Sequence, residues 1–124
     1  MPERTIGARS ESLAKGAEGW VAVAEEAALA EGGTLRAEVD GVVMTIARTE
    51  GRVYAFQEFC THRFGPLSEG AISGCEIMCP WHRSRFDIRN GRVTAGPAKV
   101  DLPTFKAEAR DGKIWVQVPA KRGE

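Results

Sequence analysis

Apolar and polar residues alternate along much of the chain, which is the pattern of β-strands with one buried face. The alternation is clear at 35–39, 42–48 and 113–118, and shorter apolar runs stand at 53–56, 75–78, 86–88 and 92–93. Dipeptides that favour tight hairpin turns separate these runs. They are Asp40–Gly41, Glu50–Gly51, Asn90–Gly91 and Asp111–Gly112. We therefore expect short antiparallel strands joined by hairpins.

Short strands at close spacing indicate an all-β fold, either an antiparallel β-sandwich or a small barrel. Residues 24–30 are apolar and acidic enough for a short helical turn, which Gly32 and Gly33 would end. The first 19 residues are small and polar and offer little to bury. We expect a leader at 1–19, one domain at 20–118 and a tail at 119–124.

Composition narrows the class of protein. The chain has 124 residues, of which 43% are hydrophobic and 27% charged, as in ordinary soluble domains. Basic and acidic residues are balanced at 17 each, so nothing predicts binding to nucleic acid or to an anionic membrane. No run approaches the roughly 20 apolar residues of a membrane span, and no secretory signal is visible. We expect a cytoplasmic protein with no membrane partner.

The segment 60–82 breaks the strand pattern and holds both histidines of the chain and all three of its cysteines. Cys60 and His62 are separated by one residue, and Cys79 and His82 by two. Each pair can be presented by one short loop, so two loops would supply two thiolates and two imidazoles. An odd number of cysteines argues against a disulfide framework and favours metal binding.

Two kinds of metal site use such ligands. A single zinc ion with Cys₂His₂ ligation is one, but zinc motifs commonly pair cysteine with cysteine and histidine with histidine. Mixed pairs fit a dinuclear cluster better, in which the two thiolates bind one iron and the two imidazoles bind the other.

The segments 60–70 and 79–87 resemble the two cluster-binding loops of the Rieske [2Fe–2S] family, and 96–98 resembles its proline loop, which covers the cluster. This resemblance extends over about residues 20–118. It implies the all-β Rieske fold, with a cluster-binding subdomain of two loops, and one [2Fe–2S] cluster. Cys60 and Cys79 would bind the buried iron, and His62 and His82 the outer iron near the surface.

The kind of Rieske protein follows from four positions. High-potential members carry an extra cysteine in each loop, joined as a disulfide, where this chain has Gly65 and Trp81. They also carry a tyrosine where this chain has Phe86, whereas Ser84 stands at the family's serine position and could donate a hydrogen bond to a sulfide. The pattern resembles the low-potential, soluble ferredoxins of ring-hydroxylating oxygenase systems.

That resemblance implies an electron carrier between a flavin-dependent ferredoxin reductase and a terminal oxygenase. An oxygenase would need two further histidines and a carboxylate for a mononuclear iron, and this chain has no histidine to spare. We therefore expect no catalysis by this chain. The alternatives are a zinc-stabilised structural or interaction module, and a Rieske subunit of another oxidoreductase such as an arsenite oxidase or a multicomponent monooxygenase.

Several residues near the ligands allow two interpretations. Trp81 could shield the cluster from water or belong to the loop core, and Pro97 would cover the cluster. Arg83 stands where the family commonly has glycine, so it would be strained if the backbone there needs a positive φ. Arg63, Arg83 and Arg85 could dock acidic partners or be solvated charges balanced by surface glutamates. The remaining expectations are Glu58, Glu69 and Glu76 as those glutamates, Cys75 as a small buried residue, and Trp20 and Trp115 as core aromatics.

Overall fold

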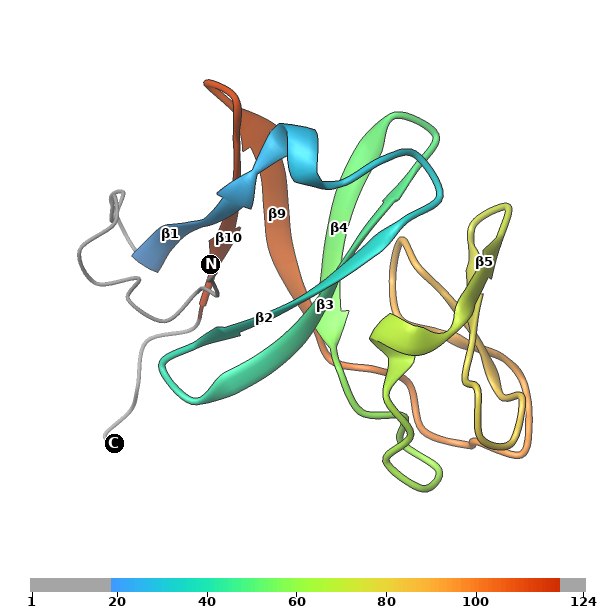
Figure 1. Ribbon diagram of the computed structural model, residues 1–124. Coiled ribbons are helices and arrows are strands. Elements are labelled where there is room, and N and C mark those ends of the chain that lie inside the picture. Colours follow the sequence, from blue (N-terminus) through green and yellow to red (C-terminus); the bar gives the residue numbers. More distant parts are fainter. Residues whose placement is uncertain (1–18, 119–124) are drawn as a thin grey trace.

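The computed structural model describes residues 19–118, so all but the last residue of the expected leader, and the whole expected tail, lie outside the described residues. Within this range ten strands form two antiparallel sheets (Figure 1). The expectation of an all-β fold is confirmed. No helix among the described residues is long and apolar enough to cross a membrane.

The larger sheet has six strands in the order β1-β10-β9-β4-β3-β2. Its edge strands β1 and β2 contact one another, so the sheet curls into a small barrel. The barrel interior is filled by aliphatic side chains such as Met44, Ile46, Ile114 and Val116. The bounds are β1 Trp20–Glu25, β2 Thr34–Val39, β3 Val42–Thr49, β4 Arg52–Gln57, β9 Thr104–Arg110 and β10 Lys113–Gln117.

Three of the four predicted hairpin turns have the expected geometry. Asp40, Glu50 and Asp111 have φ of 53°, 55° and 55°, and the glycine after each is also at positive φ, as a two-residue turn of the primed type requires. Asn90–Gly91 differs, because only Gly91 has a positive φ and it lies in a longer loop. A side chain at Gly91 would collide with the carbonyl of Leu102, which explains the glycine.

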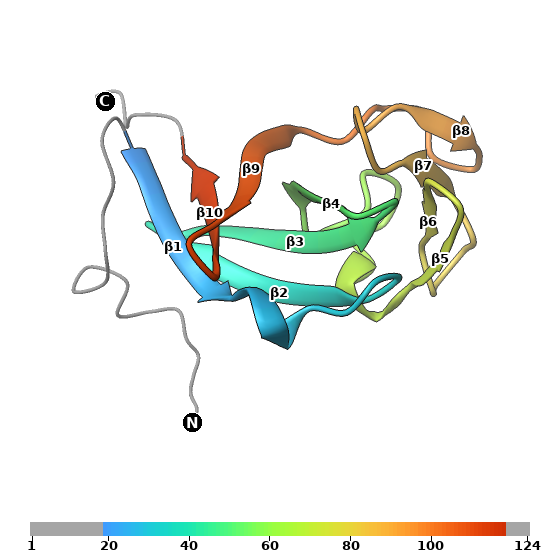
Figure 2. The same ribbon diagram turned by 90° about the horizontal axis from the view of Figure 1, so that it is seen from above.

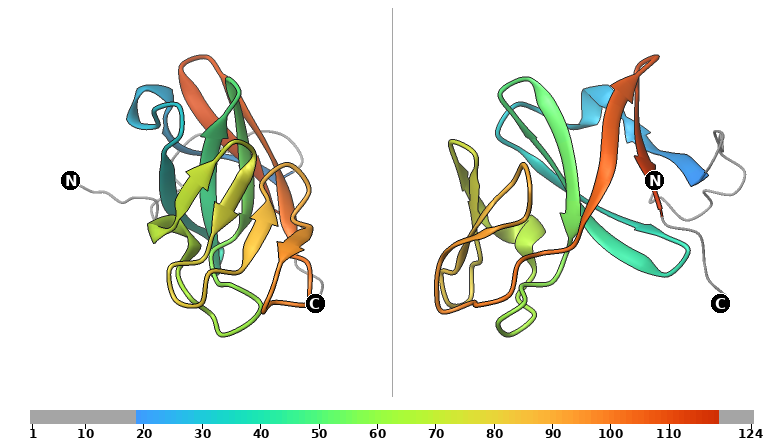
Figure 3. Two further views of the ribbon diagram at one scale, coloured as in Figure 1. Left: turned by 90° about the vertical axis from the view of Figure 1, so that its right-hand side faces the viewer. Right: turned by 180° about the vertical axis from the view of Figure 1, so that it is seen from behind.

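The smaller sheet is inserted in the chain between β4 and β9, and it forms a separate layer at one end of the barrel (Figures 2 and 3). It has a core of its own, which includes Leu67, Ile77 and Phe86 together with Cys60 and Cys79. Its order is β5-β6-β7-β8. The bounds are β5 Ala71–Ser73, β6 Glu76–Met78, β7 Arg85–Asp87 and β8 Val93–Ala95, with a short 3₁₀ turn, η4 (Leu67–Glu69), before β5.

Strand β3 joins the two cores, because both of its faces are covered. Met44 and Ile46 point into the barrel, whereas Ala47 belongs to the core of the smaller sheet. Thr45 is also fully buried. The strand that anchors the barrel thus also supports the layer that carries the candidate ligands.

Three elements differ from the sequence prediction. The expected helical turn at 24–30 is a three-residue 3₁₀ turn, η3 (Glu26–Ala28), and the residues before it form β1, which was not predicted. β1 pairs with β10, far away in sequence, so its local alanine-rich pattern does not reveal the pairing. β5 was also missed. Trp115 is buried, as expected of a core aromatic, whereas Trp20 is half-buried.

Candidate metal centre

The two loops that carry the candidate ligands have the same backbone geometry. In the first, the N–H of Cys60 donates to the carbonyl of Gly65 at 2.9 Å, and the N–H of Phe64 to the carbonyl of Cys60 at 2.7 Å. In the second, the N–H of Cys79 donates to the carbonyl of Ser84 at 2.8 Å. The N–H of Arg83 donates to the carbonyl of Cys79 at 3.0 Å.

Each loop therefore turns within six residues and begins with its cysteine, while the histidine is the third residue of the first loop and the fourth of the second. The fifth residue of each loop has a left-handed backbone: φ is 63° at Phe64 and 67° at Arg83. The positive φ that would strain Arg83 is thus present, and Phe64 shares it.

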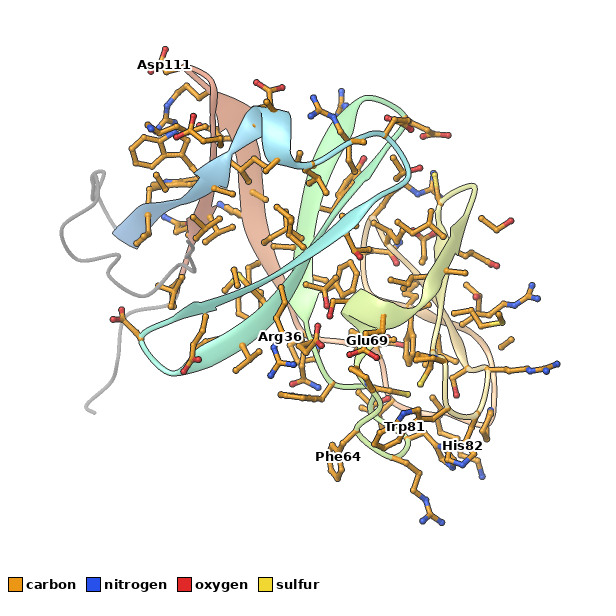
Figure 4. All side chains as sticks on the ribbon, in the orientation of Figure 1. Arg36, Phe64, Glu69, Trp81, His82 and Asp111 are labelled. Carbon is orange, nitrogen blue, oxygen red and sulfur yellow. The ribbon has the colours of Figure 1, made fainter. Side chains whose placement is uncertain are left out.

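The structure brings the four predicted ligands together at the tips of these loops. Cys60 and Cys79 are each only 1% exposed. The rings of His62 and His82 lie perpendicular to one another with centroids 5.0 Å apart, and His82 is on the surface (Figure 4). Among residues 19–118 no three His, Cys, Asp or Glu side chains converge on a point that would suit a single metal ion. The donors are instead arranged as an inner thiol pair and an outer imidazole pair.

The protonation chemistry of these donors suits a metal group. Burial, the nearby His82 and the Arg63 guanidinium lower the pKa of His62, in that order of size, and so favour the neutral imidazole that binds metals. The Nδ1 atom of His62 is buried and has no hydrogen-bond partner. Burial raises the pKa of the Cys79 thiol, although the N–H groups of Trp81 and His82 oppose this shift. Two buried sulfurs and an unsatisfied inward nitrogen fit a [2Fe–2S] cluster.

Gly65 and Trp81 face one another across the loops, at the positions where high-potential Rieske proteins carry their disulfide. A Cβ atom on Gly65 would lie 2.6 Å from the sulfur of Cys79 and 3.1 Å from Cγ of Trp81, so only glycine fits there. Cys60, Cys75 and Cys79 are all free. Trp81 is 58% exposed, so its interpretation as part of the loop core is wrong: it lies over Gly65 with much of its ring in solvent.

A third loop, residues 96–100, is hydrogen-bonded to both ligand loops. The N–H of Ala98 donates to Oγ of the fully buried Ser84 at 2.9 Å, which leaves the hydroxyl hydrogen of Ser84 free to donate elsewhere. Oγ1 of Thr61 donates to the carbonyl of Val100 at 2.6 Å. Pro97 directly precedes the first of these attachments and is exposed.

Glu58 was expected to be a surface charge, and this is wrong, because its side chain is fully buried. Its carboxylate accepts hydrogen bonds from Oγ1 of Thr45 at 2.6 Å, from Oγ of Ser68 at 2.8 Å and from the N–H of Ser68 at 3.2 Å. Nη1 of Arg36 also forms an ion pair with Oε2 of Glu58, at 3.6 Å. Glu58 thus ties η4, which directly follows the first ligand loop, to β3.

A signal for this burial exists in the sequence. Phe56, Glu58 and Cys60 alternate along the chain, so Glu58 shares the face that buries the other two. Cys75, by contrast, is only partly buried, and burial and Glu50 raise the pKa of its thiol.

A sequence profile of the Rieske [2Fe-2S] domain matches residues 19–106. The chain belongs to the Rieske [2Fe–2S] family. Its cofactor is therefore a [2Fe–2S] cluster, and a zinc module is not favoured. The chain is 36% identical to the ferredoxin component of the p-cumate 2,3-dioxygenase system of Pseudomonas putida, over 74% of this chain and 80% of that protein.

Two solved Rieske structures confirm the fold. The ferredoxin of carbazole 1,9a-dioxygenase from Nocardioides aromaticivorans matches with a TM-score of 0.76 and 31% identity, over 79% of this chain and 96% of that one. A chain in a complex of reduced oxygenase and oxidized ferredoxin of carbazole 1,9a-dioxygenase matches with a TM-score of 0.75 and 29% identity. The match covers 81% of this chain and 94% of that one.

Proposed function

We propose that this protein is a soluble single-electron carrier that passes electrons from a flavin-dependent ferredoxin reductase to the terminal oxygenase of an aromatic-ring oxygenase system. The relatives above are ferredoxin components of dioxygenase systems and match over most of their length, which supports a carrier rather than a catalyst. Both histidines of the chain lie at the candidate cluster site, so none remains for a mononuclear iron. We place the protein in the cytoplasm.

In this proposal Cys60 and Cys79 hold the inner iron and His62 and His82 the outer iron. The cluster supplies a one-electron couple. The buried cysteines keep water from the sulfur side, whereas the exposed ring of His82 offers the route by which electrons enter and leave. The free hydroxyl hydrogen of Ser84 can stabilise the reduced state. Phe86, which has no hydroxyl, cannot add a second such bond.

The observation that carries the proposal is the pairing of two buried thiols with two imidazoles on loops of matching geometry. The test is metal and sulfide analysis combined with a reductive titration. We expect about two irons and two acid-labile sulfides per chain, as in any [2Fe–2S] centre, and uptake of one electron. A colourless protein with one stoichiometric zinc would refute the proposal.

A further inference from the structure

The large apolar side chains that stand exposed within residues 19–118 all lie on the loops around the paired histidines. They are Phe64, Trp81 and Val100, at 68%, 58% and 62% exposure. Figure 4 shows Phe64, Trp81 and His82 together at one end of the molecule, far from Asp111 at the other. Val100 is held next to the first ligand loop by the hydrogen bond from Thr61. Exposed apolar side chains gathered in one place mark an interaction surface.

Two exposed side chains at this end of the molecule belong to residues with a strained backbone. Phe64 and Arg83 occupy equivalent positions of the two ligand loops, and both have a positive φ that glycine would adopt without strain. Both side chains are exposed, so packing within the fold does not explain them. Strain of this kind persists where the residue serves a function.

The charged residues of the three loops around the paired histidines are all basic. The segments 60–66, 79–85 and 96–100 contain Arg63, Arg83, Arg85 and Lys99 and no acidic residue, in a chain whose net charge is zero. Arg85 reaches Glu76 at 3.8 Å. Among the described residues no carboxylate lies within ion-pair distance of Arg63 or Arg83, so their charges remain available to a partner.

We propose that Phe64 and Trp81 form an apolar anchor, and Arg63 and Arg83 a positive rim, by which the chain docks on a terminal oxygenase whose electron-entry surface is an apolar hollow bordered by carboxylates. The proposal rests on the proposed function and adds the surface chemistry of one partner. The rim accelerates encounter with an acidic surface, and the anchor slows dissociation once water is excluded.

The test compares Phe64→Gly and Arg83→Gly with the wild type. Each change removes one side chain and also relieves the positive φ, so the docking proposal predicts slower electron transfer without a lower thermal midpoint. The control is Arg52→Gln, an exposed arginine at the start of β4. Phe64→Leu keeps an apolar side chain and should retain most of the wild-type rate.

The chemically reduced protein is mixed in a stopped-flow instrument with the oxidised terminal oxygenase of the carbazole 1,9a-dioxygenase system. We expect Phe64→Gly to lower the second-order rate constant roughly 3–10-fold at every salt concentration, as for loss of an interface anchor. Arg83→Gly should lower it by a similar factor at low salt. That deficit should shrink as salt rises, because the screening length falls to about 3 Å at 1 M. Oxidation by a small neutral quinone should be unchanged.

Rates within twofold of wild type for both glycine variants would overturn the proposal. So would a deficit that also appears with the quinone or in Arg52→Gln, since that would show a change in the cluster rather than in docking. A wild-type protein with an intact cluster spectrum that reduces the quinone but not the oxygenase would overturn the assigned partner. Failure to bind the cluster or to accept an electron would instead refute the proposed function.

Discussion

The buried carboxylate of Glu58 should hold the first ligand loop against the barrel, and its removal should loosen that loop. Glu58→Ala would leave three donors without their acceptor: the hydroxyls of Thr45 and Ser68 and the N–H of Ser68. A stranded buried donor costs about 1–3 kcal/mol, and the two hydroxyls can turn to other acceptors, so we expect a total near 3 kcal/mol. Arg36 is 52% exposed and can return to water, so its lost ion pair adds little.

Glu58→Gln should cost less, about 1 kcal/mol, because the amide oxygen still accepts one of these bonds. For a domain of this size 1 kcal/mol corresponds to roughly 4–8 °C, so the thermal midpoint should fall by about 10 °C or more in Glu58→Ala and by about 5 °C in Glu58→Gln.

The assay is thermal loss of the visible absorption of the holoprotein, with amide hydrogen exchange to locate the change. Glu69→Gln is the matched control, since Glu69 is an exposed glutamate in η4, next to the Ser68 that Glu58 binds (Figure 4). It should shift the midpoint by no more than a surface substitution does, within about 0.5 kcal/mol. Exchange should accelerate first at residues 60–70. Equal midpoints for Glu58→Ala and Glu69→Gln would refute the reasoning.

Three further results are expected. Gly65→Ala should impair cluster retention, measured as iron per chain, because its Cβ would lie 2.6 Å from the sulfur of Cys79. A variant with as much iron as the wild type would contradict this close contact. The side-chain hydrogen bond from Arg89 is the main cause of the lowered pKa of Asp87, so this carboxylate stabilises the fold above its unfolded pKa of about 3.9 and less as pH falls. Arg89→Gln should therefore flatten the acid limb of stability against pH; an unaltered limb would show that the pair contributes nothing. The reduction potential should be near −150 mV, at the low end of the Rieske range. Phe86→Tyr should raise it and Ser84→Ala should lower it in voltammetry, and shifts of the opposite sign would contradict the assigned hydrogen bonds.

The barrel strands were largely predictable because local sequence fixes them. Asp40–Gly41 and Asp111–Gly112 each dictate a two-residue turn, and such a turn sets the register of both flanking strands. β1 escaped prediction because its partner β10 lies far away in sequence and only tertiary pairing makes it a strand.

The four ligands could be predicted from the sequence because cysteine and histidine are rare in this chain and these residues are closely spaced. Their surroundings were harder to foresee, because they depend on which side chains the folded loops bring together. Glu58 looks like any surface glutamate until Thr45 and Ser68 are placed beside it. Trp81 looks like a core residue, and only the opposed Gly65 shows that the ring lies across the loop and faces solvent.

The central claim is that His62 and His82 share one [2Fe–2S] cluster with Cys60 and Cys79. Pulsed EPR of the reduced protein, grown with ¹⁵N-labelled histidine, tests it most directly. Two histidine nitrogens should couple to the electron spin, and the average g value should be low, as mixed histidine and cysteine ligation predicts. A reduced signal with no histidine coupling would contradict the account.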